Sequence, residues 1–364
     1  MLRSLRLPPK CIPYRLNELI GLNVEGHSQH RHTRIPYVLG PVPKLPSLHT
    51  MLPSSADTLK RPWRAAPTST IVESVVHFAA LDGYTLAANL YCQRGLVAPS
   101  SVILFSCGGA VPAVRYARFA RHLAQTGVAV LVYDYRGIGA SRPANLRGFS
   151  ARAEDWSEFD CGGAIAHLRL QYPGSQLIGM AHSIGALLTC GAPNVAEISR
   201  FVFLCPHTGY FGDYLPRFRV PMAVLWHGVM PLATRIFGFF PASKLGLGQD
   251  IPAGVALQWS ARTSPGLHPK ATTHTAKRAM AMIARYKQVQ GEALAVGFAD
   301  DAFATPVGSR RLLEAFPGLH ARTVSIAPGQ VGMSKIGHFG LFRRTAEVSL
   351  WPLVLGILQD WAPF

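Results

Sequence analysis

The spacing of hydrophobic and polar positions changes along the chain. Residues 71–79 form a strand pattern with Val72, Val76 and Phe78 on one face, and a second strand pattern covers residues 84–91. The Asp82-Gly83 pair between them is typical of a hairpin turn. Downstream, short continuous apolar runs predict parallel strands that are buried on both faces. These runs cover residues 101–105, 128–133, 176–180, 201–205, 293–297 and 321–326.

Helical patterns alternate with these runs. They cover residues 115–126, 154–170, 306–316 and 346–361, and another helix is expected to begin directly after Ser183. A leading hairpin followed by repeated strand–helix units predicts an α/β fold. Its central sheet is expected to be mostly parallel, with helices on both faces.

The strand–helix alternation stops at residues 206–286, which are rich in aromatic residues and proline. The segment is predicted to be a mostly helical insertion. Because it follows a strand near the carboxyl edge of the sheet, it is a candidate lid over a substrate site. The alternative is a packed structural subdomain that touches no ligand, and the two interpretations are compatible.

Residues 1–66 differ from the rest of the chain. They are rich in proline and histidine, and they hold ten Lys or Arg against three Asp or Glu. We expect a disordered basic extension here, because the segment has no persistent helix or strand period. Met51 as the true start of translation is an alternative. Residues 67–364 form the predicted folded domain.

The distribution of charge bears on nucleic-acid binding, and the cysteines bear on the cellular compartment. The net charge is +17, yet the chain has no basic run of five or more residues, so no specific nucleic-acid partner is predicted. The six cysteines have no metal-ligand spacing and suggest reduced thiols in the cytoplasm. No segment reads as a membrane span of about 20 apolar residues. Oligomeric state is not predicted.

A serine motif is the strongest chemical signal. Ala181-His182-Ser183-Ile184-Gly185 lies between a predicted strand and a predicted helix. A serine on such a sharp turn stands at the end of its strand, where it can act as a nucleophile. The usual pattern has glycine at both ends, and here alanine takes the first position. His182 is interpreted as a packing residue. His207 and His274, in the insertion, carry no readable signal.

Two later loops supply the groups that a serine nucleophile needs. A base must take the serine proton, and a carboxylate must orient the base. His338 lies between glycines after the strand at 321–326 and is the predicted base. Asp300 and Asp301 follow the strand at 293–297 and precede Pro306. Asp301 is preferred for its spacing to Pro306, with Asp300 shaping the turn.

Backbone donors are needed for the oxyanion that forms during acyl transfer. One is expected from Ile184, directly after the nucleophile. The other is expected from Gly109 or Ala110, in the glycine-containing loop after the strand at 101–105. No cofactor and no metal ion are predicted, because Gly137-x-Gly139 lacks the third glycine of a dinucleotide-binding loop.

The motifs resemble those of a known superfamily. Residues 71–364 are similar to an α/β-hydrolase of the serine aminopeptidase-like group. The resemblance rests on residues 105–112, the Asp-Tyr-Arg-Gly-Ile-Gly-Ala-Ser run at 134–141, and residues 181–185, 299–306 and 336–342. The ending at 337–343 and the insertion also resemble a bacterial group of α/β-hydrolases without an assigned substrate. The resemblance implies a serine hydrolase without a cofactor.

Two functions are consistent with these observations. The first is hydrolysis of an ester, less readily an amide, through an acyl-enzyme formed on Ser183. The aromatic insertion favours a hydrophobic small-molecule acyl substrate. The alternative is an inactive member of the fold that binds a ligand or a partner. The ordered Ser-Asp-His set favours the first.

Overall fold

The computed structural model describes residues 70–262 and 274–361. These residues belong to the larger of two structural units, which comprises residues 52–364. The predictions for residues 1–66 lie outside the described residues.

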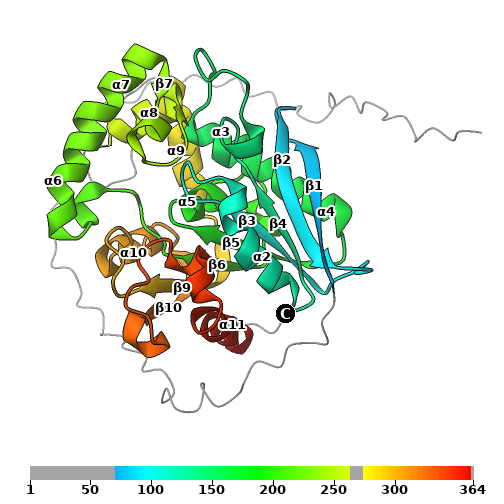
Figure 1. Ribbon diagram of the computed structural model, residues 1–364. Helices are drawn as coiled ribbons and strands as arrows, with labels where there is room; N and C mark the ends of the chain where they lie inside the picture. Colours follow the sequence, from blue (N-terminus) through cyan, green and yellow to red (C-terminus); the bar gives the residue numbers. More distant parts are fainter. Residues whose placement is uncertain (1–69, 263–273, 362–364) are drawn as a thin grey trace, which may run out of the picture. The chain divides into compact units, whose positions relative to one another are not determined.

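A sheet of eight strands forms the centre of this unit, in the order β1-β2-β4-β3-β5-β6-β9-β10 (Figure 1). Its strands are β1 (Ile71–Ala79), β2 (Thr85–Gln93), β3 (Ser101–Ser106), β4 (Ala129–Tyr133), β5 (Gln176–His182), β6 (Arg200–Leu204), β9 (Gln290–Phe298) and β10 (Gly318–Ile326). β1 and β2 form the predicted antiparallel hairpin, and β2 pairs antiparallel with β4. From β4 to β10 all pairs are parallel. The predicted mostly parallel sheet is confirmed.

Burial explains the apolar runs. Every residue of β3 and β4 is buried, and so is every residue of β5 except Gln176. A strand covered on both faces cannot alternate apolar with polar residues. β9 begins three residues before the predicted strand, because Gln290, Gly291 and Glu292 extend the ladder beyond the apolar run.

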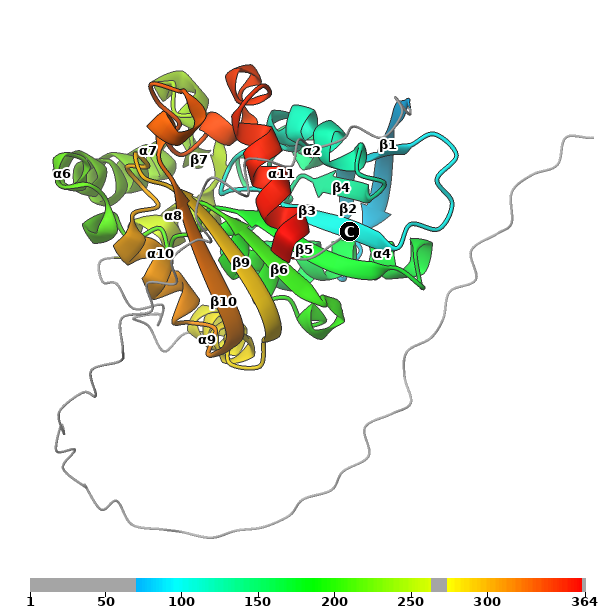
Figure 2. The same ribbon diagram turned by 90° about the horizontal axis from the view of Figure 1, so that it is seen from below.

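Helices cover both faces of the sheet (Figure 2). They are α2 (Ala117–Ala124), α3 (Ala153–Asp155), α4 (Gly162–Gln171), α5 (Gly185–Cys190), α10 (Pro306–Leu313) and α11 (Leu350–Trp361), with a π-helical turn, η3 (Trp156–Cys161), between α3 and α4. Short 3-10 turns are η1 (Ala113–Tyr116), η2 (Gly139–Ser141), η4 (Val195–Glu197), η5 (Phe211–Asp213), η8 (Pro328–Val331), η9 (Gly340–Phe342) and η10 (Arg344–Ala346). α2 and α11 pack together through Phe119 and Trp351, whose ring centroids are 5.7 Å apart.

The insertion between β6 and β9 is mostly helical where it is described, as expected. Its elements are α6 (Pro216–Val224), η6 (Leu225–Val229), α7 (Met230–Phe237), β7 (Phe239–Phe240), η7 (Ala242–Leu245), β8 (Ile251–Pro252), α8 (Ala253–Ser260) and α9 (His274–Tyr286). α6, η6 and α7 run on as one helix at the edge of Figure 1.

This continuous helix is apolar in its overall composition. Its 22 residues, Pro216–Phe237, have the length and composition of a membrane span, and only 17% of its most apolar window is buried. It contains no unbroken apolar run of the length that the sequence prediction required. Here arginines, prolines and a histidine interrupt the apolar residues, which nevertheless dominate. A single helix of this kind is weak evidence for a membrane span.

Ionic contacts of Arg136 join the hairpin to the segment after β4. The guanidinium of Arg136 donates to Asp82 at 2.6 and 2.7 Å and to Asp160 at 2.7 Å. Its backbone N–H also donates to Asp160, at 2.8 Å. Arg136 belongs to the Asp-Tyr-Arg-Gly run of the sequence. Its side chain therefore fastens the antiparallel edge of the sheet to the loop that follows β4.

Candidate active site

Ser183 lies at a strained turn between β5 and α5. Its φ is +59°, a left-handed conformation that is rare for a residue with a side chain. A Cβ at Gly185 would stand 2.5 Å from the carbonyl oxygen of Cys107, so only glycine lets α5 begin this close to the end of β3. The sequence motif therefore produces the predicted sharp turn, with Ser183 at the carboxyl end of a parallel strand.

His338 and Asp301 form a hydrogen-bonded pair. His338 Nδ1 lies 2.7 Å from Asp301 Oδ2, and both side chains are buried. Burial would raise the pKa of Asp301, but the hydrogen bond and charge of His338 outweigh it, with help from the N–H groups of Ala304 and Phe303. The pKa of Asp301 consequently lies well below its usual value. The carboxylate stays ionised and orients the imidazole, the arrangement that the sequence predicted for these two residues.

Asp300 supports the loop that carries His338. Its two carboxylate oxygens accept hydrogen bonds from the N–H groups of Ile336 and Gly337, both at 2.9 Å. Of the two candidate acids, only Asp301 therefore bonds to the histidine ring. Asp300 therefore fixes the backbone of the two residues that precede His338, which agrees with its expected role in shaping the turn.

His207 is the residue that sequence reasoning missed. Ser183 Oγ lies 2.8 Å from His207 Nε2, and this is the hydrogen bond that the structure gives to the serine hydroxyl. No hydrogen bond joins Ser183 to His338 among the described residues. The ring centroids of His207 and His338 are 5.2 Å apart. The position of His207 in the sequence could have indicated its role. His207 follows β6, which pairs with β5, so it lies at the same carboxyl edge of the sheet as Ser183.

The contacts of His207 define its tautomer. The backbone N–H of Gly209 donates to His207 Nδ1 at 3.0 Å, so Nδ1 is an acceptor. The proton of the neutral ring is then on Nε2, which donates to Ser183 Oγ. Burial lowers the pKa of His207 to about 3, and the neighbouring His338 and Arg262 act in the same direction. His207 is therefore a neutral donor at the nucleophile.

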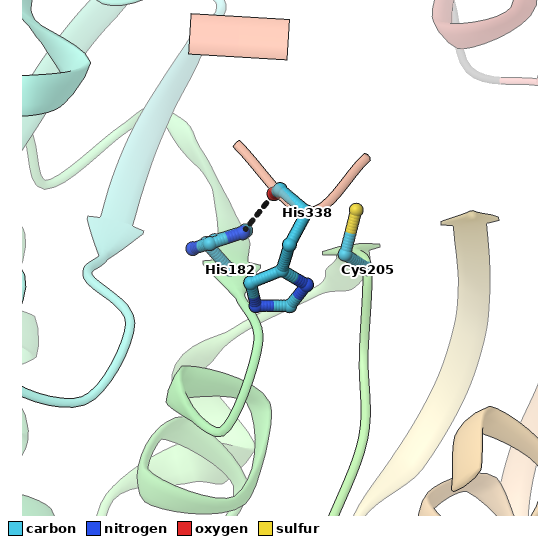
Figure 3. Close-up of side chains that lie close together, drawn as sticks. All are labelled: His182, Cys205 and His338. Atoms are coloured by element: carbon cyan, nitrogen blue, oxygen red, sulfur yellow. Dashed lines mark hydrogen bonds between the residues drawn. The ribbon is translucent and has the colours of Figure 1, made fainter. Parts of the chain in front are cut away.

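His182 connects the two loops on either side of Ser183. Figure 3 shows its ring beside His338, with a hydrogen bond from His182 Nε2 to the His338 carbonyl oxygen, at 3.1 Å. Tyr116 OH lies 3.0 Å from His182 Nδ1 and itself accepts the N–H of Gly108, at 2.9 Å. His182 is fully buried and acts as a packing and hydrogen-bonding residue, as predicted.

Cys205 lies next to His182 and His338 in Figure 3. The ligand atoms of the three residues lie within 4.8 Å of one another, a spacing that a metal ion could use. However, both nitrogens of His182 and Nδ1 of His338 are engaged in the hydrogen bonds described above, and burial raises the pKa of the Cys205 thiol well above its usual value. A neutral thiol is a poor metal ligand. The donor set does not fit a metal ion.

The loop that carries Gly109 and Ala110 contacts Ile184. A Cβ at Gly109 would stand 2.7 Å from Ile184 Cδ1, so the loop after β3 touches the residue that follows the nucleophile. Ala110 has a φ of +59°, which turns the loop sharply at this point. Within the described residues, the N–H groups of Ile184, Gly109 and Ala110 have no hydrogen-bond acceptor. These donors are therefore free to bind an oxygen atom.

Aromatic rings surround the two histidines. Tyr214 packs on His207 at 5.8 Å between centroids, and Phe303 packs on His338 at 5.6 Å. Trp226 contacts Tyr214 at 5.5 Å and Trp259 at 5.4 Å. Of these rings, all except Phe303 come from the insertion. The insertion therefore supplies part of the surroundings of the nucleophile, as its interpretation as a lid requires.

A family model places the chain. The model described as "Serine aminopeptidase, S33" matches residues 97–317, which include Ser183 and Asp301. The chain belongs to this family. It is an α/β-hydrolase and a serine hydrolase of the esterase or aminopeptidase type. His338 lies beyond the matched residues.

Solved structures agree with the fold. The chain resembles the Pyrococcus furiosus esterase Pf2001 with a TM-score of 0.50 and 15% identity, covering 82% of this chain and 96% of that one. It resembles DcsB, solved in complex with its substrate analogue, with a TM-score of 0.51 and 16% identity, covering 80% and 100%. No curated protein matches the chain. At these identities the structural likeness supports the α/β-hydrolase fold.

Proposed function

We propose that this protein hydrolyses a carboxylic ester through an acyl-enzyme formed on Ser183. One observation carries the proposal: a serine at a left-handed turn lies at the same sheet edge as a buried His338–Asp301 pair. In the first step His338 takes the Ser183 proton while Oγ attacks the carbonyl carbon. The oxyanion that forms accepts hydrogen bonds from the N–H groups of Ile184 and of Gly109 or Ala110.

The second half of the reaction uses the same groups. His338 gives its proton to the alcohol as it leaves, and the acyl group remains on Ser183. Water then attacks the acyl-enzyme while His338 takes its proton, and His338 returns that proton to Ser183 Oγ as the carboxylic acid leaves. Asp301 stabilises the imidazolium that forms in each half. An ester is favoured over an amide because an amine must be protonated before it can leave.

His207 assists this reaction as a hydrogen-bond donor. Its Nε2–H points at Ser183 Oγ, so the serine proton remains free to pass to His338. His207 cannot accept that proton at Nε2, because the Gly209 N–H holds the ring in the protonated-Nε2 tautomer. When the acyl-enzyme breaks down, Ser183 Oγ is the leaving atom, and a donor beside it stabilises the negative charge that develops there.

The surroundings of the site favour a hydrophobic small-molecule acyl substrate. Tyr214, Trp226, Trp259 and Phe303 offer apolar area next to the two histidines. We propose that the insertion acts as a lid over this region.

The five described cysteines are all free thiols, four of them buried, and we propose a cytoplasmic location on that basis.

A fluorophosphonate probe tests the nucleophile. The intact protein is expected to react at Ser183, whereas Ser183→Ala and His338→Ala are expected to show no labelling. With a p-nitrophenyl ester, loss of the triad should lower kcat by roughly 10⁶-fold. Cys92→Ser, a change at a half-buried thiol on β2, serves as a control that should keep full labelling. Labelling that persists in Ser183→Ala would reject the proposal.

A binding protein with an inactive site is the second candidate. It is favoured by one observation: Ser183 is hydrogen-bonded to His207 rather than to His338. If that contact holds the hydroxyl away from its base, the intact protein will bind small esters without turnover and will not be labelled. Restored labelling in His207→Ala would then identify the contact as the cause.

A further inference from the structure

Three buried polar groups next to the nucleophile lack partners. They are the Thr208 hydroxyl, the indole Nε1 of Trp259 and the guanidinium Nη2 of Arg262, and none has a hydrogen-bond partner within the described part of the chain. Buried donors are nearly always satisfied in folded proteins, so each such group requires an explanation. All three come from two short segments, the residues after β6 and the end of α8.

The indole of Trp259 and the guanidinium of Arg262 meet at Gly209, the residue that follows Thr208. On the side of Gly209 where a side chain would stand, a Cβ would lie 3.3 Å from Ile184 Cγ2 and 3.7 Å from both Arg262 Nη1 and Trp259 Nε1. With a φ of +76°, Gly209 turns the chain without filling this space. Gly209 is also the residue whose N–H bonds His207. The imidazole of His207 therefore links this backbone to Ser183.

Among the described residues, no carboxylate pairs with the guanidinium of Arg262. Its Nη1 donates to the carbonyl oxygen of Thr208, which carries no net charge. Asp213 lies in its neighbourhood but is committed to Arg311, at 2.8 and 3.0 Å. Burial lowers the pKa of Arg262, yet a guanidinium remains protonated at any working pH.

A guanidinium whose Nη2 is buried without an anion destabilises the fold. The residues that follow Arg262 do not supply one, because the sequence Thr-Ser-Pro-Gly-Leu-His-Pro-Lys-Ala-Thr-Thr at 263–273 has no acidic residue. A ligand with a negative charge would satisfy Arg262, and it would also accept from the indole and hydroxyl donors.

We propose that the substrate carries a carboxylate, which binds to Arg262, Trp259 and Thr208. This inference rests on the proposed function and adds the chemical class of its substrate. The carboxylate would lie within the reach of an acyl chain from the scissile carbonyl, because Ile184 borders both the space at Gly209 and the expected oxyanion position. The preferred substrate is then a half-ester of a dicarboxylic acid, with an apolar chain between its ends.

Matched substrates test the inference. Each p-nitrophenyl half-ester of adipic, suberic and sebacic acid is paired with its methyl-capped neutral counterpart. The measured quantity is the ratio of kcat/KM for the acid over kcat/KM for the capped ester. The intact protein is expected to favour the acid by about 10 to 100-fold for at least one chain length, the usual worth of a hydrogen bond to a charged group. A ratio near 1 at every length overturns the inference.

Variants locate the effect. In Arg262→Gln the ratio should fall to about 1, and in Trp259→Phe, which keeps the ring but loses its N–H, it should fall by a smaller factor. Arg118→Gln is the control, because that arginine pairs with Glu347 at the surface, and its ratio should equal that of the intact protein. An unchanged ratio in Arg262→Gln and Trp259→Phe would reject the carboxylate site even if one variant folds poorly.

A binding measurement separates this inference from the hydrolytic proposal. Calorimetric titration of Ser183→Ala with the p-nitrophenyl half-ester should detect binding that disappears when Arg262→Gln is added. If the intact protein hydrolyses no ester but this difference is found, the hydrolytic proposal fails and the carboxylate site stands. If esters are hydrolysed without an Arg262-dependent preference, the reverse holds.

Discussion

His207 Nε2 lies 2.8 Å from Ser183 Oγ, whereas His338 is bonded through Nδ1 to Asp301. The two histidines near the serine hydroxyl therefore differ in their ability to accept a proton. His207 carries its proton on the nitrogen that faces the serine, and it is held in that state by Gly209. His338 is the histidine with a carboxylate partner, so it alone is equipped to take up and release a proton.

Replacing His207 tests this division of roles. In His207→Gln the side-chain amide can still donate to Ser183, so we expect kcat for a p-nitrophenyl ester within about tenfold of the intact protein. His207→Asn keeps an acceptor for the Gly209 N–H but is too short to reach the serine, and kcat should fall by about 10 to 100-fold. Stopped-flow kinetics should place the loss in breakdown of the acyl-enzyme. If both variants were as inactive as His338→Ala, His207 would be the base.

The two aspartates are expected to differ in effect. Asp301→Asn keeps the size of the side chain but removes the charge that orients His338, so kcat should fall by about 10⁴-fold. Asp300→Asn keeps one acceptor for the Ile336 or Gly337 N–H, so the larger effect should be on stability. Steady-state kinetics and thermal melting of the two variants measure this contrast. Equal losses of kcat in the two variants would show that Asp301 is not the only aspartate that the reaction requires.

Stability should decline in mild acid because of His207. Its pKa is lowered from an ordinary value of 6.5 to about 3 in the folded protein, so between these pH values the unfolded chain binds the proton and the folded one does not. The free energy of unfolding should therefore fall as the pH drops from about 6.5 toward 3, by up to about 1.4 kcal/mol per pH unit.

Urea unfolding at a series of pH values measures this slope. His207→Gln removes the titrating group, so its slope should be shallower than that of the intact protein in the same window. His320 is exposed on β10 and provides the matched control, His320→Gln. The same slope in His207→Gln and the intact protein would mean that His207 is not buried in its neutral form.

Arg136 should be important for stability. It bonds Asp82 and the fully buried Asp160, so Arg136→Met leaves an unpaired buried carboxylate and should lower the free energy of unfolding by about 3–5 kcal/mol. The exposed pair of Arg118 and Glu347 is a suitable comparison, and Arg118→Gln should cost about 0–1 kcal/mol. Urea denaturation would measure both. A cost for Arg136→Met no larger than that of the control would contradict the role of the buried contacts.

Local sequence was informative wherever a strand led into a turn. The run around Ser183 predicted both the end of β5 and the start of α5, because the close approach of the helix to Cys107 requires Gly185. The segment at residues 300–306 predicted a strand end, an acid and a helix start for the same kind of reason. Steric constraints of this kind act between neighbouring residues, so the local sequence reveals them.

The sequence by itself determined the α/β architecture, the parallel strands and the candidate residues Ser183, Asp301 and His338, because strand burial and tight turns depend on neighbouring residues. Only the tertiary structure decided which side chains meet. It brought His207 to Ser183 and directed Asp301 rather than Asp300 to His338. It also left the buried Nη2 of Arg262 without a partner within the described part of the chain. Such contacts join residues that are far apart in the chain, and the physical reason is that they depend on how strands and loops pack, which no local pattern encodes.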